Sequence, residues 1–143
     1  MINKKSGITL TSIVMYIILF FAFSSITIII SSRMNKNLFE DRGKAINISN
    51  INKLEYNLLD SSNKSNNVII QKTSNEEKII FSNNDEYRYN KEDKIIYKNN
   101  GKLIKNVVSF ETNETAGYID INIILNKYTN IIERNIKVGM KIS

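Results

Sequence analysis

The sequence predicts an α+β fold in which one long N-terminal helix precedes an antiparallel β-meander. Three observations lead to this prediction. Apolar side chains recur at helical spacing in the first part of the chain, and no proline interrupts it. After Asn67 the apolar residues instead alternate with polar ones, as in half-buried strands. The segment DSSNKSNN at 60–67, rich in capping and turn residues, separates the two patterns.

The helix begins with an uncharged apolar run between Lys5 and Arg33. From residue 8 to residue 32 it covers ~37 Å at about 1.5 Å per residue, which exceeds the roughly 30 Å hydrocarbon core of a bilayer. The run is therefore predicted to be a single membrane span. Because Lys4 and Lys5 precede it, the positive-inside rule favours an N-terminus inside the cytoplasm and residues 34–143 outside.

A secretory signal peptide is the alternative interpretation of this run. Such signals have an apolar region of about 7–15 residues followed by a small-residue cleavage site. This run is longer and no A-x-A pattern follows it, although the serine pairs at 24–25 and 31–32 imitate a cleavage site. We expect the segment to be retained as an anchor in the cytoplasmic membrane.

One face of the predicted span carries hydroxyl groups. Its members follow one another at intervals of three or four residues, and all but Phe20 carry a hydroxyl: Thr9, Ser12, Tyr16, Phe20, Ser24, Thr27 and Ser31. Hydroxyl side chains are tolerated in membrane helices because they can bond to the i−4 carbonyl. They also allow close helix packing, so the stripe is a candidate assembly face.

Beyond the span, the pattern predicts an amphipathic continuation of the helix over 33–62 and a β domain over 67–143. The apolar positions of this continuation are Leu38, Ile46, Ile51, Leu54, Leu58 and Leu59. Gly43 lies inside it and is expected to weaken or bend the helix locally. The helix should fade within the segment DSSNKSNN at 60–67.

The expected strands follow the change of period. Apolar runs occur at 68–73 and 78–82, and EYRYN and DKIIYK come before a hairpin turn at Asn100-Gly101. Two alternating segments complete the meander, with apolar positions at Ile119, Ile121, Ile123 and Leu125, then at Ile136, Val138, Met140 and Ile142.

Composition excludes several kinds of chemistry. The chain has no cysteine and no histidine, so it has no thiolate nucleophile, no imidazole base and no metal site of the usual nitrogen or sulfur ligands. No acid, base or nucleophile constellation emerges, and we expect neither enzymatic activity nor a cofactor.

Two alternative binding functions stay open. Tyrosines among basic residues, at 87, 89, 97, 118 and 128, could stack on single-stranded DNA, and acidic turns at 76–77, 85–86 and 92–93 could bind calcium.

The start of the chain resembles the N-terminus of type IV prepilins and pseudopilins. These proteins have a short basic leader, a glycine before the cleavage site, and then an apolar residue, Thr, Leu, a variable residue and Glu. Lys4, Lys5 and Ser6 precede Gly7, and Ile8, Thr9 and Leu10 follow it. The resemblance implies a leader over 1–7, cleavage between Gly7 and Ile8 by prepilin peptidase, and N-methylation of Ile8.

Two positions depart from this family pattern. Ile8 stands where Phe or Met is usual, which keeps the site apolar. Ser12 stands where the family has the Glu thought to pair with a neighbouring subunit's N-terminal amine. The departure at Ser12 points away from a major, repeated subunit and toward a minor pilin.

Residues 78–125 resemble a narrower group: the W-type minor pilins, the J-type pseudopilins of type II secretion and the F-type competence pseudopilin. The shared features are a Tyr-rich strand, an acidic turn, an Ile/Leu-Tyr strand, a Gly turn and a Leu-x-x-Asn-Val-x-x-Phe stretch. The resemblance implies a filament subunit whose partners are the membrane, prepilin peptidase and other minor and major pilins. A single-pass membrane protein that never assembles is the alternative.

Overall fold

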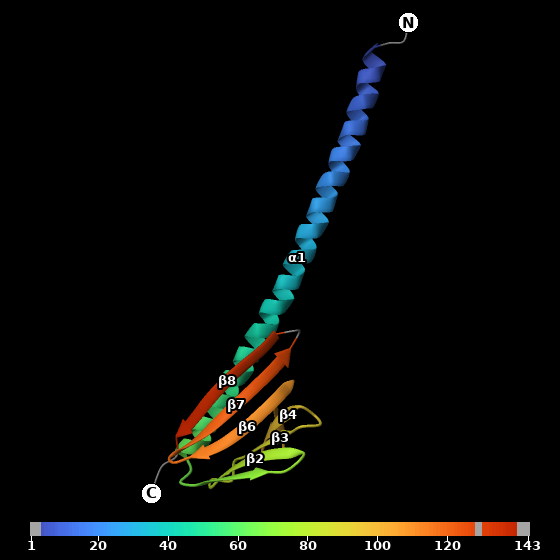
Figure 1. Ribbon diagram of the computed structural model, residues 1–143. Helices are drawn as coiled ribbons and strands as arrows, with labels where there is room; N and C mark the ends of the chain where they lie inside the picture. The colour runs from blue at the N-terminus through green and yellow to red at the C-terminus, as the bar shows by residue number, and fades with distance from the viewer. Residues whose placement is uncertain (1–3, 128–129, 140–143) are drawn as a thin grey trace. The chain divides into compact units, whose positions relative to one another are not determined.

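The computed structural model describes residues 4–127 and 130–139, and within them one helix, α1 (Lys4–Asn63), precedes eight strands (Figure 1). The chain divides into two compact units, residues 1–39 and 40–143. The first unit contains only the N-terminal part of α1. The second contains the rest of α1 and all the strands. The predicted α+β fold class, a long helix followed by antiparallel strands, is thereby confirmed.

The strands form two antiparallel sheets rather than one continuous meander. The first sheet has the order β1 (Val68–Lys72), β2 (Glu76–Phe81), β3 (Glu86–Asn90), β4 (Ile95–Lys98) and β5 (Gly101–Lys105). The second has the order β6 (Val107–Thr115), β7 (Tyr118–Lys127) and β8 (Asn130–Gly139). The break falls at Asn106, where a positive φ of 63° turns the chain out of the first sheet.

The predicted hairpin between β4 and β5 exists, but its turn lies one residue earlier than expected. Lys98 pairs with Gly101, so Asn99 and Asn100 form the two-residue loop, with φ of 47° and 68°. Asparagine tolerates the left-handed region, and two positive φ values are what a type I′ turn requires. Gly101 is the first residue of β5, where a Cβ would lie 3.3 Å from the carbonyl oxygen of Lys98.

One hydrophobic core joins both sheets to the C-terminal part of α1, which lies along the second sheet in Figure 1. Along β7 every second side chain is buried, and the period of two predicted for this segment is correct. Burying one Ile, Leu or Phe side chain contributes roughly 1.5–3 kcal/mol. The fully buried members with the largest side chains are Tyr87, Phe81, Phe110, Ile51, Leu54, Leu58, Ile79, Ile96, Ile104, Ile119, Ile121 and Ile123.

The helix contributes a narrower buried stripe than the sequence predicts. Gly43, Asn47, Ile51, Leu54 and Leu58 are buried at intervals of three or four residues. The other apolar positions named above are exposed, Leu38 at 48%, Ile46 at 39% and Leu59 at 40%. The stripe includes a glycine and an asparagine, which a hydrophobic pattern does not select. The helix is not interrupted at Gly43, where the sequence suggested local weakening or bending.

Two asparagines hold the start of β8 against the helix. The side-chain amide of Asn130 donates to the carbonyl of Glu40 at 3.0 Å, and the amide of Asn47 donates to the carbonyl of Asn130 at 3.3 Å. Near the other end of β8, the hydroxyl of Ser62 donates to the carbonyl of Gly139. These bonds satisfy carbonyl groups of the edge strand β8 and of the helix. The helix ends at Asn63, inside the segment 60–67 where it was expected to fade. The predicted strand positions Met140 and Ile142 lie outside the described residues.

Candidate functional site: the apolar part of the helix

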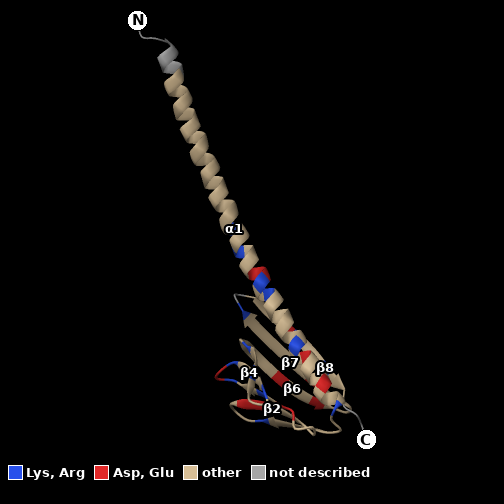
Figure 2. Ribbon diagram, turned by 180° about the vertical axis from the view of Figure 1, so that it is seen from behind, with Lys and Arg blue, Asp and Glu red and all other residues tan. Residues whose placement is uncertain are grey.

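The N-terminal part of α1 exposes large apolar side chains on every face. They run from Leu10 to Ile30, with exposed fractions between 48% at Val14 and 73% at Tyr16. In Figure 2 this part of the helix is free of charged residues until the first basic turn, which the sequence places at Arg33. A helix that is apolar all round must be covered, because such a continuous surface is not stable in water.

A bilayer is one environment that would cover this surface. In the described residues, α1 is the one helix long and apolar enough to cross a membrane, with a mean hydropathy of 2.7 in its most apolar window. An α-helix pairs its backbone groups within the segment itself, as a lipid environment demands. The segment can therefore serve as a single-pass membrane anchor.

The predicted cleavage site lies on this helix. Lys4, Lys5, Gly7 and Ile8 have helical backbone, and their side chains fall outside the described set. The following residues, Thr9, Leu10 and Ser12, are exposed, Leu10 at 66%.

The hydroxyl stripe lies on one helix, as its spacing requires, and Tyr16 and Phe20 on it are 73% and 69% exposed. Its members Ser24, Thr27 and Ser31 lie along the exposed apolar segment, where Ser24 is half-buried. Thr27 donates to the carbonyl of Phe23 at 2.9 Å, and Ser25, beside the stripe, donates to Phe21 at 2.8 Å. These bonds satisfy the hydroxyl protons within the helix, and the oxygen lone pairs can still accept.

A polar network that the sequence did not reveal joins the end of the helix to two β-turns. Ser61 donates to Asp85 at 2.6 Å, and because its only proton is then used, Tyr87 donates to Ser61 at 2.8 Å. Asp85 also accepts bonds from Asn83 at 3.1 Å and Asn99 at 3.0 Å. The residues are ordinary turn and cap formers, so only their meeting in space distinguishes them.

Two groups of this network have shifted pKa values. Desolvation by itself would raise the pKa of Asp85, but hydrogen bonds from Ser61 and Asn99, among others, hold the pKa below its ordinary value of 3.8. Burial raises the pKa of the Tyr87 phenol above its ordinary value of 10.0, although Ser61 and Lys98 oppose this effect. The ionised carboxylate and the neutral phenol are therefore the forms that the fold favours.

The sign of each shift predicts a stability profile. A lowered carboxyl pKa contributes stability above the ordinary value of 3.8 that is lost as the pH falls through the folded-state pKa. A raised phenol pKa contributes stability that is present below 10.0 and lost as the pH rises through the folded-state pKa. Urea unfolding of the full chain in detergent, followed by circular dichroism, should show both losses.

The substitution Asp85→Asn should lower the free energy of unfolding by about 1–3 kcal/mol at neutral pH. It should also reduce the loss of stability at acidic pH. An unchanged loss at acidic pH would show that Asp85 is not its source.

The tyrosines considered for DNA stacking are mostly engaged inside the fold. Tyr87 and Tyr89 are 0% and 3% exposed. Tyr97 lies under the guanidinium of Arg88, 5.1 Å from the ring centroid, and Tyr118 lies under the ammonium of Lys137 at 5.3 Å. Tyr128 lies outside the described residues.

The acidic residues considered for calcium do not form a cluster of three or more potential ligands among the described residues. Glu76 pairs with Lys78 and Arg88 at 3.4 and 3.5 Å, and Glu77 is buried. In the part of the chain that the structure describes, no three carboxylates gather as metal ligands would.

No family model, no curated protein and no solved structure matches this chain.

Proposed function

We propose that this chain is a minor pilin or pseudopilin, a structural subunit that initiates or caps a type IV pilus-like filament after prepilin peptidase removes residues 1–7. The N-terminus lies inside the cytoplasm and the β domain outside, and the assembled subunit reaches the cell surface. The same subunit plan serves pili, type II secretion and competence. The proposal is for a structural role without catalysis.

One observation carries the proposal: the exposed apolar part of α1 starts within the Gly7-Ile8-Thr9-Leu10 sequence, at Leu10. A cut after Gly7 keeps the span, whereas signal peptidase would remove it. The same helix, α1, continues into the core of the β domain through Ile51 and Leu54. A subunit of this kind can leave the bilayer by exchanging lipid contacts for contacts with the helices of other subunits.

Ser12 is the residue that decides the position of the subunit in this proposal. A carboxylate near this end of the span would be costly in lipid, by up to about 2.5–3.5 kcal/mol at the membrane centre, unless an amine compensates it. The hydroxyl of Ser12 carries neither that cost nor that attraction. The subunit therefore fits a place in an initiating or tip complex better than a repeated place along the shaft.

The first test separates assembly from simple anchoring. Surface filaments are sheared from cells that express a tagged chain, and the filament and membrane fractions are compared by immunoblotting. We expect a small amount of chain with Ile8 at its N-terminus in the filament fraction. A chain confined to the membrane fraction, in cells that do make filaments, contradicts assembly.

Ser12→Glu tests the role of the missing charge. We expect this substitution to raise incorporation into sheared filaments several-fold, because the new carboxylate can pair with the amine of a neighbouring subunit. Ser12→Gln, which has similar size and no charge, is the matched control and should leave incorporation unchanged. Equal incorporation of all three forms would show that position 12 has no assembly role.

The second candidate is a single-pass membrane protein whose exported domain binds a partner without assembling. The bonds from Ser25 and Thr27 to their own helix favour this alternative, because they satisfy the hydroxyl protons without a neighbouring helix. It leaves the sequence around Gly7 as a coincidence. The same fractionation distinguishes it, since this protein would remain with the membrane.

A further inference from the structure

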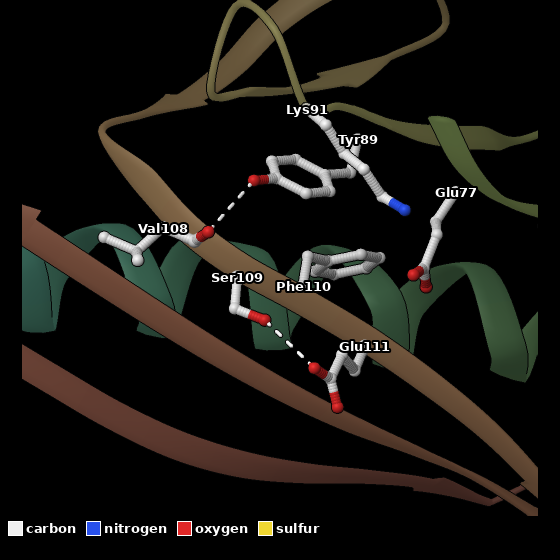
Figure 3. A pocket seen from close by; sticks show the side chains of 7 residues that line it. All are labelled: Glu77, Tyr89, Lys91, Val108, Ser109, Phe110 and Glu111. Atoms are coloured by element: carbon white, nitrogen blue, oxygen red, sulfur yellow. Dashed lines mark hydrogen bonds between the residues drawn. The ribbon is translucent and has the colours of Figure 1, made fainter. Parts of the chain in front are cut away.

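A cavity of about 270 Å³ in the β domain holds a carboxylate that the chain itself already contacts (Figure 3). The buried Glu77 accepts a hydrogen bond from the hydroxyl of Thr112 at 3.3 Å, and Figure 3 shows the ammonium of Lys91 turned toward the same space. Phe110, on the strand beside the cavity, is 1% exposed. The groups of this cavity therefore do not indicate a ligand.

A lysine, an asparagine and an aspartate from different parts of the chain meet beside the C-terminal part of α1. The ammonium of Lys98, the last residue of β4, donates to the side-chain oxygen of Asn57 on α1 at 3.1 Å. The carboxylate of Asp85, just before β3, lies 3.7 Å from the same nitrogen. An amine, a carboxamide and a carboxylate are thus neighbours, and these are the groups from which an amide bond between two side chains can form.

Hydrogen bonds orient the amide toward the amine. The amide nitrogen of Asn57 donates to the carbonyl of Lys53 at 2.7 Å, so the amide oxygen is the atom that meets Lys98. Since a carbonyl bond is about 1.23 Å long, the Cγ carbon of Asn57 lies within about 4.3 Å of the lysine nitrogen. A small rotation of either side chain brings the two atoms to the roughly 3–3.5 Å of a reactive geometry.

The cluster is partly shielded from water. The side chain of Lys98 is 23% exposed and that of Asp85 is 19% exposed, while Asn57 is half-buried. The ammonium of Lys98 also lies over the ring of Tyr87, 5.4 Å from its centroid. Groups held in a fixed geometry react as if at effective concentrations of up to about 10⁵–10⁸ M. An amide that free amines in water leave untouched therefore faces one lysine for the lifetime of the folded protein.

We propose that Lys98 and Asn57 form an isopeptide bond, a covalent link between β4 and α1, with Asp85 as the group that transfers the protons. Asp85 accepts a proton from the ammonium, and the free amine attacks Cγ of Asn57. The bond between Nζ and Cγ forms, and the bond between Cγ and Nδ2 breaks. Two protons of the lysine ammonium end on the departing nitrogen, which leaves as ammonium, and Asp85 is again a carboxylate.

The link would fasten the first sheet to the helix. It joins residues 41 positions apart and so restricts the unfolded chain, as a disulfide does. The chain has no cysteine and cannot use a disulfide for this purpose. The bond is independent of filament assembly, and it forms equally in an anchored protein that never polymerises.

The test measures the mass of the full chain, expressed in a host without prepilin peptidase, purified in detergent and incubated at neutral pH. We expect a mass that is lower than the sequence requires by one ammonia molecule. Trypsin does not cut after an acylated lysine, so digestion should give a branched peptide that joins residues 54–64 to residues 95–102. Fragmentation of this peptide should place the branch between Asn57 and Lys98.

Variants assign the roles of the three residues. Lys98→Arg and Asn57→Ala remove the amine and the amide, and neither variant should lose ammonia. Asp85→Asn should reduce the linked fraction at least tenfold in chains that circular dichroism shows to be folded. Lys64→Arg is the matched control, because Lys64 pairs with Asp60 at 2.7 Å near the same end of the helix, and it should still lose ammonia.

Three results would overturn the proposal. A wild-type chain that keeps its full mass would show that Lys98 and Asn57 share only a hydrogen bond. Loss of a water molecule, with the branch at residue 85, would place the bond between Lys98 and Asp85 instead. Conversion of Asn57 to aspartate without a branched peptide would show that water, and not the lysine, attacks this amide. Full linkage in Asp85→Asn would remove Asp85 from the reaction.

Discussion

Replacement of Tyr87 by alanine is expected to lower the free energy of unfolding of the β domain by about 3–5 kcal/mol, the range for removing a large buried aromatic side chain. The ring is 0% exposed and packs edge-on against Phe81, with the centroids 5.8 Å apart. The ammonium of Lys98 lies 5.4 Å from the ring centroid. Loss of the ring would leave a cavity and also break the hydrogen bond to Ser61.

Tyr87→Phe separates these two effects. This variant keeps the packing and removes the hydroxyl, so it should cost about 1 kcal/mol. Urea titrations of the full chain in detergent, followed by circular dichroism, give both values from the shift in midpoint. A loss below about 1 kcal/mol for Tyr87→Ala would mean that the residue is not in the core. Equal losses for the two variants would mean that the hydroxyl, and not the ring, is important.

Replacement of Gly7 by leucine is expected to block removal of the leader, so that the precursor accumulates in the membrane and disappears from sheared filaments. Glycine lets a peptidase approach the backbone closely, because no Cβ stands in the way. A leucine at the last leader position obstructs that approach. The measurement is the mass of the N-terminal peptide of the membrane-extracted chain.

Ser6→Leu is the matched control for this substitution, because it adds a side chain of the same size one residue earlier. We expect this variant to be processed like the wild type, with Ile8 as the new terminus. Normal processing of Gly7→Leu would contradict the proposed cleavage site. Failure of both variants would mean that the leader as a whole, rather than Gly7, is recognised.

Periodic patterns predicted the fold class well. Alternation over residues 118–125 placed β7 in its buried register, and the helical period located Ile51, Leu54 and Leu58 in the core. These patterns reflect local geometry, which every residue of an element shares. The hairpin near Asn100 was also predicted, but its turn shifted by one residue because asparagine accepts a positive φ as glycine does.

Features made by residues distant in sequence could not be read from the pattern. The Ser61–Asp85–Tyr87 network joins residues 24 and 26 positions apart, and each of them is common in turns or strands. The buried state of Glu77 depends on β6 packing near β2, whereas the sequence placed this residue in an exposed turn. Long-range packing, not local propensity, decided both.

The sheet boundary at Asn106, with its positive φ, and the irregular start of β6 leave little trace in the hydrophobic pattern. Val107 and Phe110 are both buried although they are three residues apart, because the register between β6 and β7 shifts between Val107 and Ser109. A bulge of this kind bends a strand without leaving a clear mark on its composition. The candidate processing site, by contrast, depends on seven contiguous residues and a span, which the sequence presents directly.

The mass of the mature N-terminus tests the central claim most directly. The wild-type chain is extracted from the membrane and from sheared filaments, digested, and its N-terminal peptide is measured by mass spectrometry. We expect a peptide that begins at Ile8, with or without one methyl group. A peptide that begins at Met1, or one that begins after Ser25 or Ser32, would contradict it.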